Sequence, residues 1–214
     1  MRVLLLLLLL ASVTLRAQDA APSGSLLAQQ RLAAVLRQAT ADYESGDFQG
    51  AIARLDSLQG EAAGDLSVLN LRAAALTKAG NYDQAAQIFA GILRANPEYF
   101  PAAFNAGEVQ FLSGKREAAL ETFRLLRQRD PRNELLRFKY FLCQFALGRD
   151  EDAAKTARAM QPAGSTPSWY YAQALFARRQ GDESKARKNL QAARSLYGED
   201  GCRLFDESVT AAGL

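Results

Sequence analysis

The chain of 214 residues contains no histidine, only two cysteines and a single tryptophan. Histidine is the side chain that most often serves as a general base or a metal ligand near neutral pH. Its absence excludes the serine-triad and zinc-protease motifs, which both require it. There is no CxxC pair, and the stretch from Gly107 to Lys115 lacks the spacing of a phosphate-binding loop. We therefore expect no catalytic residue, no metal and no cofactor.

An excess of charge of either sign is also absent. The chain holds 26 basic and 23 acidic residues, and Arg2 and Arg16 lie in a leader that we expect to be removed. The remaining 24 basic and 23 acidic residues exert no net attraction on nucleic acid or on an anionic membrane. The balance therefore predicts no nucleic-acid partner.

The charges are nevertheless unevenly distributed. Residues 42–65 contain six acidic residues and one basic residue, whereas residues 115–139 contain eight basic and four acidic residues. A solvated surface explains such clusters most simply. Attraction to an acidic partner, or antiparallel association of two copies into a homo-oligomer, is the alternative.

Long apolar runs are absent except near the start of the chain. A basic residue at position 2, an apolar run over residues 3–10 and a small residue, Ala17, together indicate a secretory signal peptide over residues 1–17. The run is shorter than the roughly 20 residues that a membrane-spanning helix needs. We predict cleavage after Ala17, no stable membrane insertion afterwards, and a bacterial protein that is periplasmic or secreted. An uncleaved membrane tether and a leucine-rich cytoplasmic helix are the alternatives.

Residues 18–25 are small and polar and include Pro22 and Gly24, so we expect a flexible linker there.

Glycine and alanine recur downstream of this linker at a nearly fixed interval. Four glycines are spaced 34 residues apart, a fifth follows after 33 residues, and an alanine lies five residues after each of them. Such self-similarity predicts a repeat architecture. The glycines and their alanines are Gly46 and Ala51, Gly80 and Ala85, Gly114 and Ala119, Gly148 and Ala153, and Gly181 and Ala186.

Each repeated position has a physical role in a pair of helices. Glycine can end the first helix in the left-handed conformation without steric cost. A polar residue after it, such as Asp47, Asn81 or Asp182, can cap the second helix. The alanine permits close approach of the two helices. Apolar residues four and seven positions later extend one buried stripe, which comprises Leu55 and Leu58, Phe89 and Ile92, Phe123 and Leu126, and Leu190 and Ala193.

This 34-residue unit resembles the tetratricopeptide repeat (TPR). The clearest unit covers residues 100–133, with Gly107, Gly114, Ala119, Phe123 and Pro131 in family positions. The resemblance implies an all-α fold, a right-handed superhelical solenoid of antiparallel helix pairs. About five repeats are expected, at about residues 32–65, 66–99, 100–133, 134–166 and 167–200, within a repeat domain of residues 26–200. A generic helical bundle and another solenoid of helix pairs are the alternatives.

The ends and the cysteines complete the fold prediction. The first helix is expected from about Ser25 to Ser45, and residues 201–214 form a tail or a cap. In the cap, a short helix over residues 203–212 would turn Leu204, Phe205 and Val209 inward. A disulfide needs Cα atoms within about 7 Å, and a full repeat should separate Cys143 from Cys202. We expect no bridge and a buried Cys143, with a disulfide as the alternative.

The resemblance also implies a partner-binding groove. In the TPR family, the first helix of each repeat lines a concave face, and aromatic side chains beside amides and charges suit a bound helix or extended peptide. Packing of the aromatic side chains between repeats is the alternative. The predicted groove residues are Asn70, Phe104, Asn105, Glu108, Phe138, Lys139, Tyr171 and Arg178, with Leu36, Arg37, Tyr43, Thr77, Phe111, Phe145 and Leu175 at further inward positions.

Three functions are compatible with these observations. The first is an exported scaffold or adaptor that binds a peptide or helix of a cell-envelope partner in the groove. The second is a structural component of an envelope complex that self-assembles through its repeat ends. The third is an enzyme or small-molecule binder that uses Glu108, Lys139 and Tyr171. Recognition of a terminal carboxylate is not expected, because only Asn105 and Lys139 match the family positions for it.

Overall fold

The computed structural model describes residues 24–162 and 164–213, so the predicted signal peptide and most of the predicted linker lie outside the described residues. The described part is helical and contains no β-strand. No helix within it is both long and apolar enough to cross a bilayer. The helices are α1 (Gly24–Glu44), α2 (Phe48–Asp56), the 3₁₀ helix η1 (Gly60–Gly64), α3 (Leu66–Lys78), α4 (Tyr82–Ala95), α5 (Phe100–Leu112), α6 (Arg116–Arg129), α7 (Glu134–Ala146), α8 (Asp150–Arg158), α9 (Ser168–Arg179) and α10 (Glu183–Ala211).

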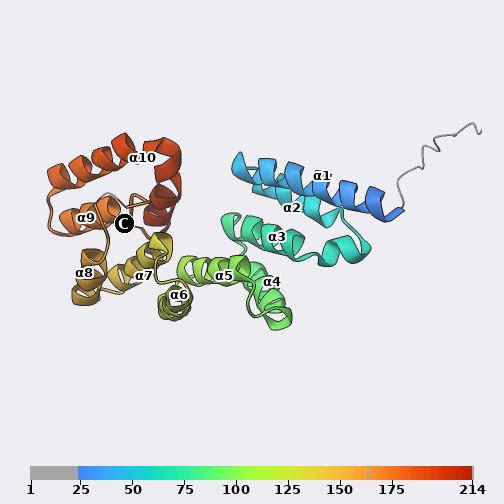
Figure 1. Cartoon of the computed structure of the whole chain (residues 1–214), viewed down its shortest axis with the longest axis horizontal. Coiled ribbons are helices and arrows are strands. Elements are labelled where there is room, and N and C mark those ends of the chain that lie inside the picture. Colours follow the sequence, from blue (N-terminus) through green and yellow to red (C-terminus); the bar gives the residue numbers. More distant parts are fainter. Residues whose placement is uncertain (1–23, 163, 214) are drawn as a thin grey trace, which may run out of the picture.

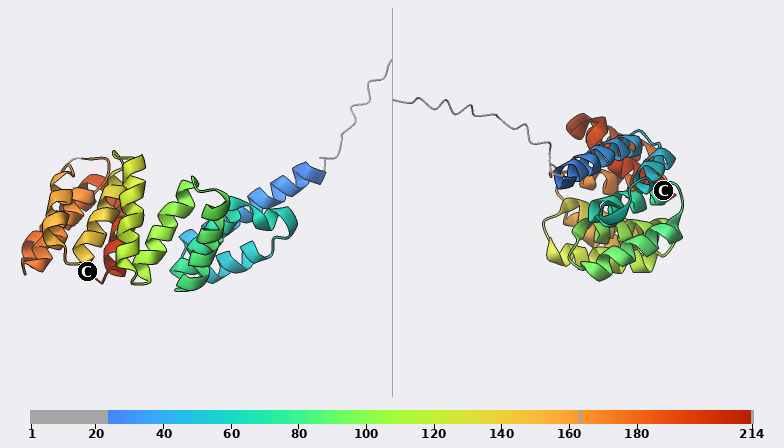
Figure 2. Two further views of the ribbon diagram at one scale, coloured as in Figure 1. Left: turned by 90° about the horizontal axis from the view of Figure 1, so that it is seen from below. Right: turned by 90° about the vertical axis from the view of Figure 1, so that its right-hand side faces the viewer.

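Successive helices pair and the pairs stack into a curved solenoid (Figures 1 and 2). The pairs are α1 with α2, α3 with α4, α5 with α6, α7 with α8, and α9 with the first part of α10. First helices also contact the first helices of neighbouring pairs, as α1 does α3, α3 does α5, and α7 does α9. The first helices line the inner, concave face of the arc. Figure 1 shows the curvature, because α1 and α10 lie on the same side of α5.

Glycine ends the first helix of every pair in the left-handed region. The φ angles of Gly46, Gly80, Gly114, Gly148 and Gly181 lie between 72° and 88°. After Gly46, for example, the amide of Asp47 donates to the carbonyl of Asp42 at 2.9 Å, and the Gly46 amide donates to Tyr43 at 3.1 Å. This Schellman arrangement uses carbonyl groups that the helix end leaves free. Each glycine therefore reverses the chain into the second helix.

Two of the three predicted caps form. The Asp47 carboxylate accepts a hydrogen bond from the amide of Gly50, and the Asp182 carboxylate accepts one from the amide of Lys185, both at 2.9 Å. The prediction for Asn81 is wrong, because its side chain makes no capping hydrogen bond to α4.

The alanine of each repeat lies where paired helices touch. Ala51, Ala85, Ala119, Ala153 and Ala186 have no exposed surface. Of the stripe that follows them, Leu190 alone is only half-buried, and the other seven residues are 8% exposed or less. The small side chains let the helices approach, and the larger ones fill the space beside them.

The last helix departs from the simple stacking of repeats. Gly198 has φ 72° and ψ 172° inside α10, so the chain turns there and residues 199–211 form a separate helical segment, here called the return helix. In Figure 1 it turns back from α10 toward α7. The return helix starts earlier than predicted. Phe205 and Val209 are buried as expected, but Leu204 is 40% exposed and points away from the core.

A carboxylate fastens the irregular segment before α9 to the start of α7. Glu134, the first residue of α7, accepts hydrogen bonds from the Thr166 amide at 2.8 Å and from the Ser165 and Thr166 hydroxyls at 3.0 Å. These bonds fasten the segment to the start of the fourth pair and accommodate the 33-residue spacing to the fifth.

Both cysteines are free and buried, in agreement with the predictions of no disulfide and a buried Cys143. Burial raises the pKa of the Cys143 thiol to about 12, so this thiol is neutral near pH 7 and behaves as a small apolar core residue.

The contact between α5 and α6 depends on a glycine. A Cβ atom on the buried Gly107 would lie 2.8 Å from Cζ of Phe123, whose ring is 1% exposed. We predict that Gly107→Ala lowers the free energy of unfolding by about 1–3 kcal/mol, because the ring must move within a packed core. Chemical denaturation followed by circular dichroism measures the change.

Gly91→Ala is the matched control. Gly91 lies in α4, is exposed, and has no neighbouring atom within 4 Å of the added Cβ. Alanine there should raise the stability by about 0.5–1 kcal/mol through the lower entropy of the unfolded chain. Equal destabilisation by both substitutions would contradict the steric explanation.

Candidate functional site

A cavity of about 610 Å³ opens on the concave face. Its volume falls within the range of about 300–1,000 Å³ typical of ligand-binding pockets. First helices form most of its wall, and the return helix closes one side. The lining residues include Thr40, Tyr43 and Glu44 from α1; Leu71, Ala74, Thr77 and Lys78 from α3; Phe104, Asn105, Glu108, Phe111 and Leu112 from α5; Lys139 and Leu142 from α7; and Arg203, Leu204, Glu207 and Ser208 from the return helix.

A buried lysine lies at the centre of this wall. The Lys139 side chain is 2% exposed, and its Nζ donates to Oε2 of Glu108 and to Oγ of Ser208, both at 2.6 Å. The ring centroid of Phe104 is 5.9 Å from the same nitrogen. A charged ammonium group tolerates burial only when it is paired and hydrogen-bonded. Lys139 therefore joins α5, α7 and the return helix.

A second lysine links the return helix to the N-terminal half of the solenoid. Nζ of Lys78, at the end of α3, lies 2.6 Å from Oε2 of Glu207. Burial alone lowers the pKa of Lys78, but the hydrogen bond to Glu207 and the neighbouring charges outweigh this effect, so the pKa is raised. Lys78 stays protonated at neutral pH and pairs with a residue 129 positions away.

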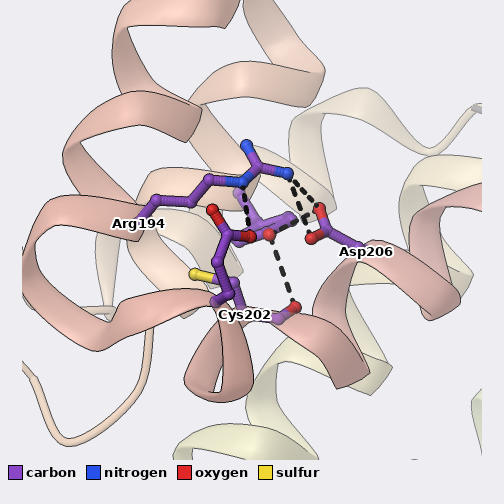
Figure 3. A network of polar contacts seen from close by, with 5 residues as sticks. Arg194, Cys202 and Asp206 are labelled. Atoms are coloured by element: carbon purple, nitrogen blue, oxygen red, sulfur yellow. Dashed lines mark hydrogen bonds and ion pairs between the residues drawn. The ribbon is translucent and has the colours of Figure 1, made fainter.

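A tyrosine and an arginine also bind the return helix, through its residue Asp206 (Figure 3). The Tyr171 hydroxyl donates to Oδ1 of Asp206 at 2.6 Å, and Arg194 donates to both Asp206 carboxylate oxygens, at 3.2 and 3.1 Å. Burial, and then the hydrogen bond to Asp206, raise the pKa of Tyr171. The Tyr171 hydroxyl therefore remains a neutral donor at physiological pH.

Aromatic packing accompanies these polar contacts. The Phe205 ring centroid lies 4.8 Å from that of Phe138 on α7 and 5.4 Å from that of Tyr171 on α9. Phe138 and Tyr171 are 0% and 1% exposed as a result. The return helix thus covers the concave face over α7 and α9 and leaves the cavity beside α1, α3 and α5.

The structure divides the predicted groove residues into two groups. Asn70, Phe104, Asn105 and Glu108 are half-buried near the open cavity, where the Asn105 amide donates to Oδ1 of Asn70 at 3.1 Å. Tyr43 also lines the cavity.

The prediction that Phe138, Lys139 and Tyr171 are exposed in the groove is wrong. They face the concave side, but the return helix buries them. Thr77, Phe111, Phe145 and Leu175 are buried as well, and for the two phenylalanines this is the packing between repeats that was the alternative. Arg178 is half-buried, does not line the cavity, and lies 3.8 Å from Glu183. Glu108 and Lys139 come together, whereas Tyr171 bonds to Asp206. Glu108, Lys139 and Tyr171, the three residues considered for a small-molecule site, therefore do not all contact one another.

Sequence reasoning missed the residues that hold the return helix. Lys78, Arg194, Asp206, Glu207 and Ser208 carry no repeat signature, so periodicity could not identify them. A weak signal was available in the spacing of Cys202, Phe205 and Val209, which lie on one face of a helix and are all buried.

A curved stack of helix pairs with a cavity on its inner face defines a helical-repeat solenoid. Two sequence models of the tetratricopeptide repeat match the chain, over residues 36–100 and residues 76–137. The chain therefore contains tetratricopeptide repeats. A comparison with curated proteins finds no matching sequence.

Solved structures share the fold at low sequence identity. TTC0263, a thermophilic TPR protein of Thermus thermophilus, is 19% identical with a TM-score of 0.67, over 86% of this chain and all of the other. MamA from Desulfovibrio magneticus RS-1 is 16% identical with a TM-score of 0.59, over 78% of this chain and 94% of the other. MamA MSR-1 is 18% identical with a TM-score of 0.55, over 78% and 96% of the two chains. These similarities establish the all-helical TPR solenoid.

The buried ion pair yields a test of the groove wall. Glu108→Gln leaves the Lys139 ammonium without its carboxylate partner, so we predict a loss of about 2 kcal/mol in the free energy of unfolding. Urea denaturation measures this loss. The control, Glu98→Gln, removes an exposed pair with Arg129 and should change stability by less than about 0.5 kcal/mol. Unchanged stability in Glu108→Gln would show that the pair does not support the wall.

Proposed function

We propose that this protein is an exported scaffold that binds a helical or extended segment of a cell-envelope partner in the open part of its concave groove. Tetratricopeptide repeats generally form protein–protein interaction scaffolds, and the chain contains such repeats. The observation that carries the proposal is the cavity of about 610 Å³ on the concave face, which the return helix leaves uncovered beside α1, α3 and α5.

The chemistry of the cavity suits a peptide segment. Tyr43, Leu71 and Phe104 provide apolar surface, and the amide of Asn105 provides a polar group beside them. Large apolar side chains next to a few polar groups are the usual composition of an interface core. Such a wall accepts one apolar side chain of the partner and orients its backbone.

The charges around the cavity favour a partner segment of mixed charge. Glu44 and Glu108 contribute carboxylates, whereas Lys78 and Arg203 contribute cations. Glu108 and Lys78 already have partners within the chain, namely Lys139 and Glu207. Glu44 and Arg203 are both exposed at the rim, where charges affect association rate and specificity more than affinity.

The groove is tested by filling it without removing an existing contact. Ala74 lies half-buried on α3 in the cavity wall, so Ala74→Arg places a long, charged side chain in the space that a partner would occupy. We predict that this variant loses at least about tenfold in partner recovery, a fold-change equal to about 1.4 kcal/mol. Cross-linking in intact diderm cells, followed by quantitative mass spectrometry, measures the recovery.

The control for this experiment is Ala90→Arg, which adds the same side chain at an exposed position of α4 outside the cavity. Ala90→Arg should retain the partners of the unmodified chain. Loss of partner recovery in both variants, or in neither, would contradict the proposal that the partner binds in the groove. Recovery of only self-cross-linked chains would favour a self-assembling component instead.

Export is tested separately. The proposal rests here on the basic residue 2, the apolar run of residues 3–10 and the small residue Ala17. Expressed in a diderm bacterium, the chain should appear in the periplasmic fraction or medium with Gln18 as its first residue. Replacing Leu6 and Leu7 with arginine should keep it in the cytoplasm at full length. Periplasmic chain that still begins at Met1 would support a tether instead of a cleaved signal.

A further inference from the structure

The return helix lies where a bound partner helix would lie. A further helix of a solenoid ordinarily stacks on the end of the last pair, but residues 199–211 turn back over the concave face. Their contacts come from three inner helices: Lys78 of α3, Lys139 of α7 and Tyr171 of α9. One short helix therefore bridges much of the length of the groove.

The groove-facing side of this helix has a definite chemical pattern. Cys202, Phe205 and Val209 are 0%, 4% and 7% exposed and form its apolar stripe. Asp206, directly after the aromatic anchor, accepts from Tyr171 and Arg194. Ser208 accepts from Lys139, and Glu207 pairs with Lys78. The return helix thus presents to the groove a small residue, an aromatic residue three positions later, and acidic residues immediately after the aromatic one.

The attachment of this helix to the solenoid is a single glycine turn. Gly198 takes the left-handed conformation at φ 72°, and no other atom lies within 4 Å of the position a Cβ would occupy. Leu204 and Glu207 of the return helix border the cavity and are only partly covered, since Leu204 is 40% exposed and the Glu207 side chain is 46% exposed. Release of the segment from the groove would therefore require a backbone rotation at Gly198 and the loss of the bonds from Arg194 to Asp206.

We propose that the return helix is an internal ligand of the groove, and that the partner is an amphipathic helix of the same chemistry that replaces it. This inference rests on the proposed function, because it extends the partner's site on the same concave face from the open part beside α1, α3 and α5 to the part that the return helix covers over α7 and α9. A tethered segment acts at an effective concentration in the millimolar range. A partner consequently binds the closed form with an apparent affinity reduced by the fraction of chains that are open.

The test uses the full chain and a defined probe. The probe is a fluorescently labelled peptide with the sequence of residues 199–212, kept reduced at its cysteine. In the full chain, the double substitution Phe205→Ala and Asp206→Asn removes the aromatic anchor and the carboxylate of the internal helix. We expect this variant to bind the peptide at least about tenfold more tightly than the unmodified chain, because the internal competitor is weakened. Fluorescence anisotropy measures both affinities.

Two controls define specificity. Thr210→Ala changes an exposed residue of the same helix and should leave peptide affinity at the level of the unmodified chain. A peptide carrying Phe205→Ala should not bind the double variant. In a chain that also carries Lys78→Glu, the original peptide should lose affinity and a Glu207→Lys peptide should regain it, because the pair across the groove is restored with reversed charges.

Amide hydrogen exchange gives a second measurement, which can be interpreted even if the double variant is destabilised. In the unmodified full chain, amides of residues 199–211 should exchange faster than those of α7 and α9, which indicates local opening at Gly198. In the double variant, added peptide should restore protection to α7 and α9. Failure of the peptide to bind a variant whose α1–α9 remain protected, or exchange of residues 199–211 only with global unfolding, would overturn the proposal.

The outcome is separable from that of the proposed function. The peptide assay reports on the covered part of the groove over α7 and α9, whereas Ala74→Arg reports on the open part beside α3. Unchanged capture with Ala74→Arg would reject the open groove as a docking site. Absence of peptide binding would reject only the internal ligand.

Discussion

The solenoid depends on the distance at which paired helices can meet. At five positions that distance is set by an alanine with no exposed surface, and once more by Gly107, which leaves room for the ring of Phe123. A larger side chain at these positions would separate the helices and remove the contacts of the stripe beside them. The left-handed glycines contribute the second half of the constraint, since each fixes the direction in which the next helix leaves. Repeated five times, one close contact and one turn determine the curvature of the concave face.

The return helix packs into the concave face that this curvature produces. Lys139 is only 2% exposed, and its burial on the inner face is tolerated because its ammonium group pairs with Glu108 and donates a hydrogen bond to Ser208. Phe138 and Tyr171 are acceptable there because Phe205 covers them. The inner surface over α7 and α9 is therefore built as a hydrophobic core with a few satisfied polar groups, whereas the surface beside α1 and α3 keeps a cavity. One concave face thus has two regions of different character.

Sequence periodicity predicted the helix pairs, the glycine turns and the buried alanines because each of these is a local property that recurs every 34 residues. The resemblance to the TPR family, in turn, implied which residues of each first helix face inward. Exposure was not predictable in the same way. Phe138 and Tyr171 occupy inward positions like that of Phe104, and they are buried only because residues 199–211 pack on them. That contact follows from a single turn at Gly198 and an ion pair across 129 positions, and neither belongs to the repeat.

In most repeat arrays each unit contacts only its neighbours, so units can form in any order. Here the order of folding is constrained, because the helix that covers α7 and α9 follows both of them along the chain. Helices α1 to α6 can pack as soon as they have been made, but Phe138 and Tyr171 stay uncovered until residues 199–211 arrive. Uncovered aromatic surface on a partly folded chain is a site for aggregation and for chaperones. A chain in which residues 199–211 have not yet packed therefore carries uncovered aromatic surface over α7 and α9, and the arrival of one helix removes it.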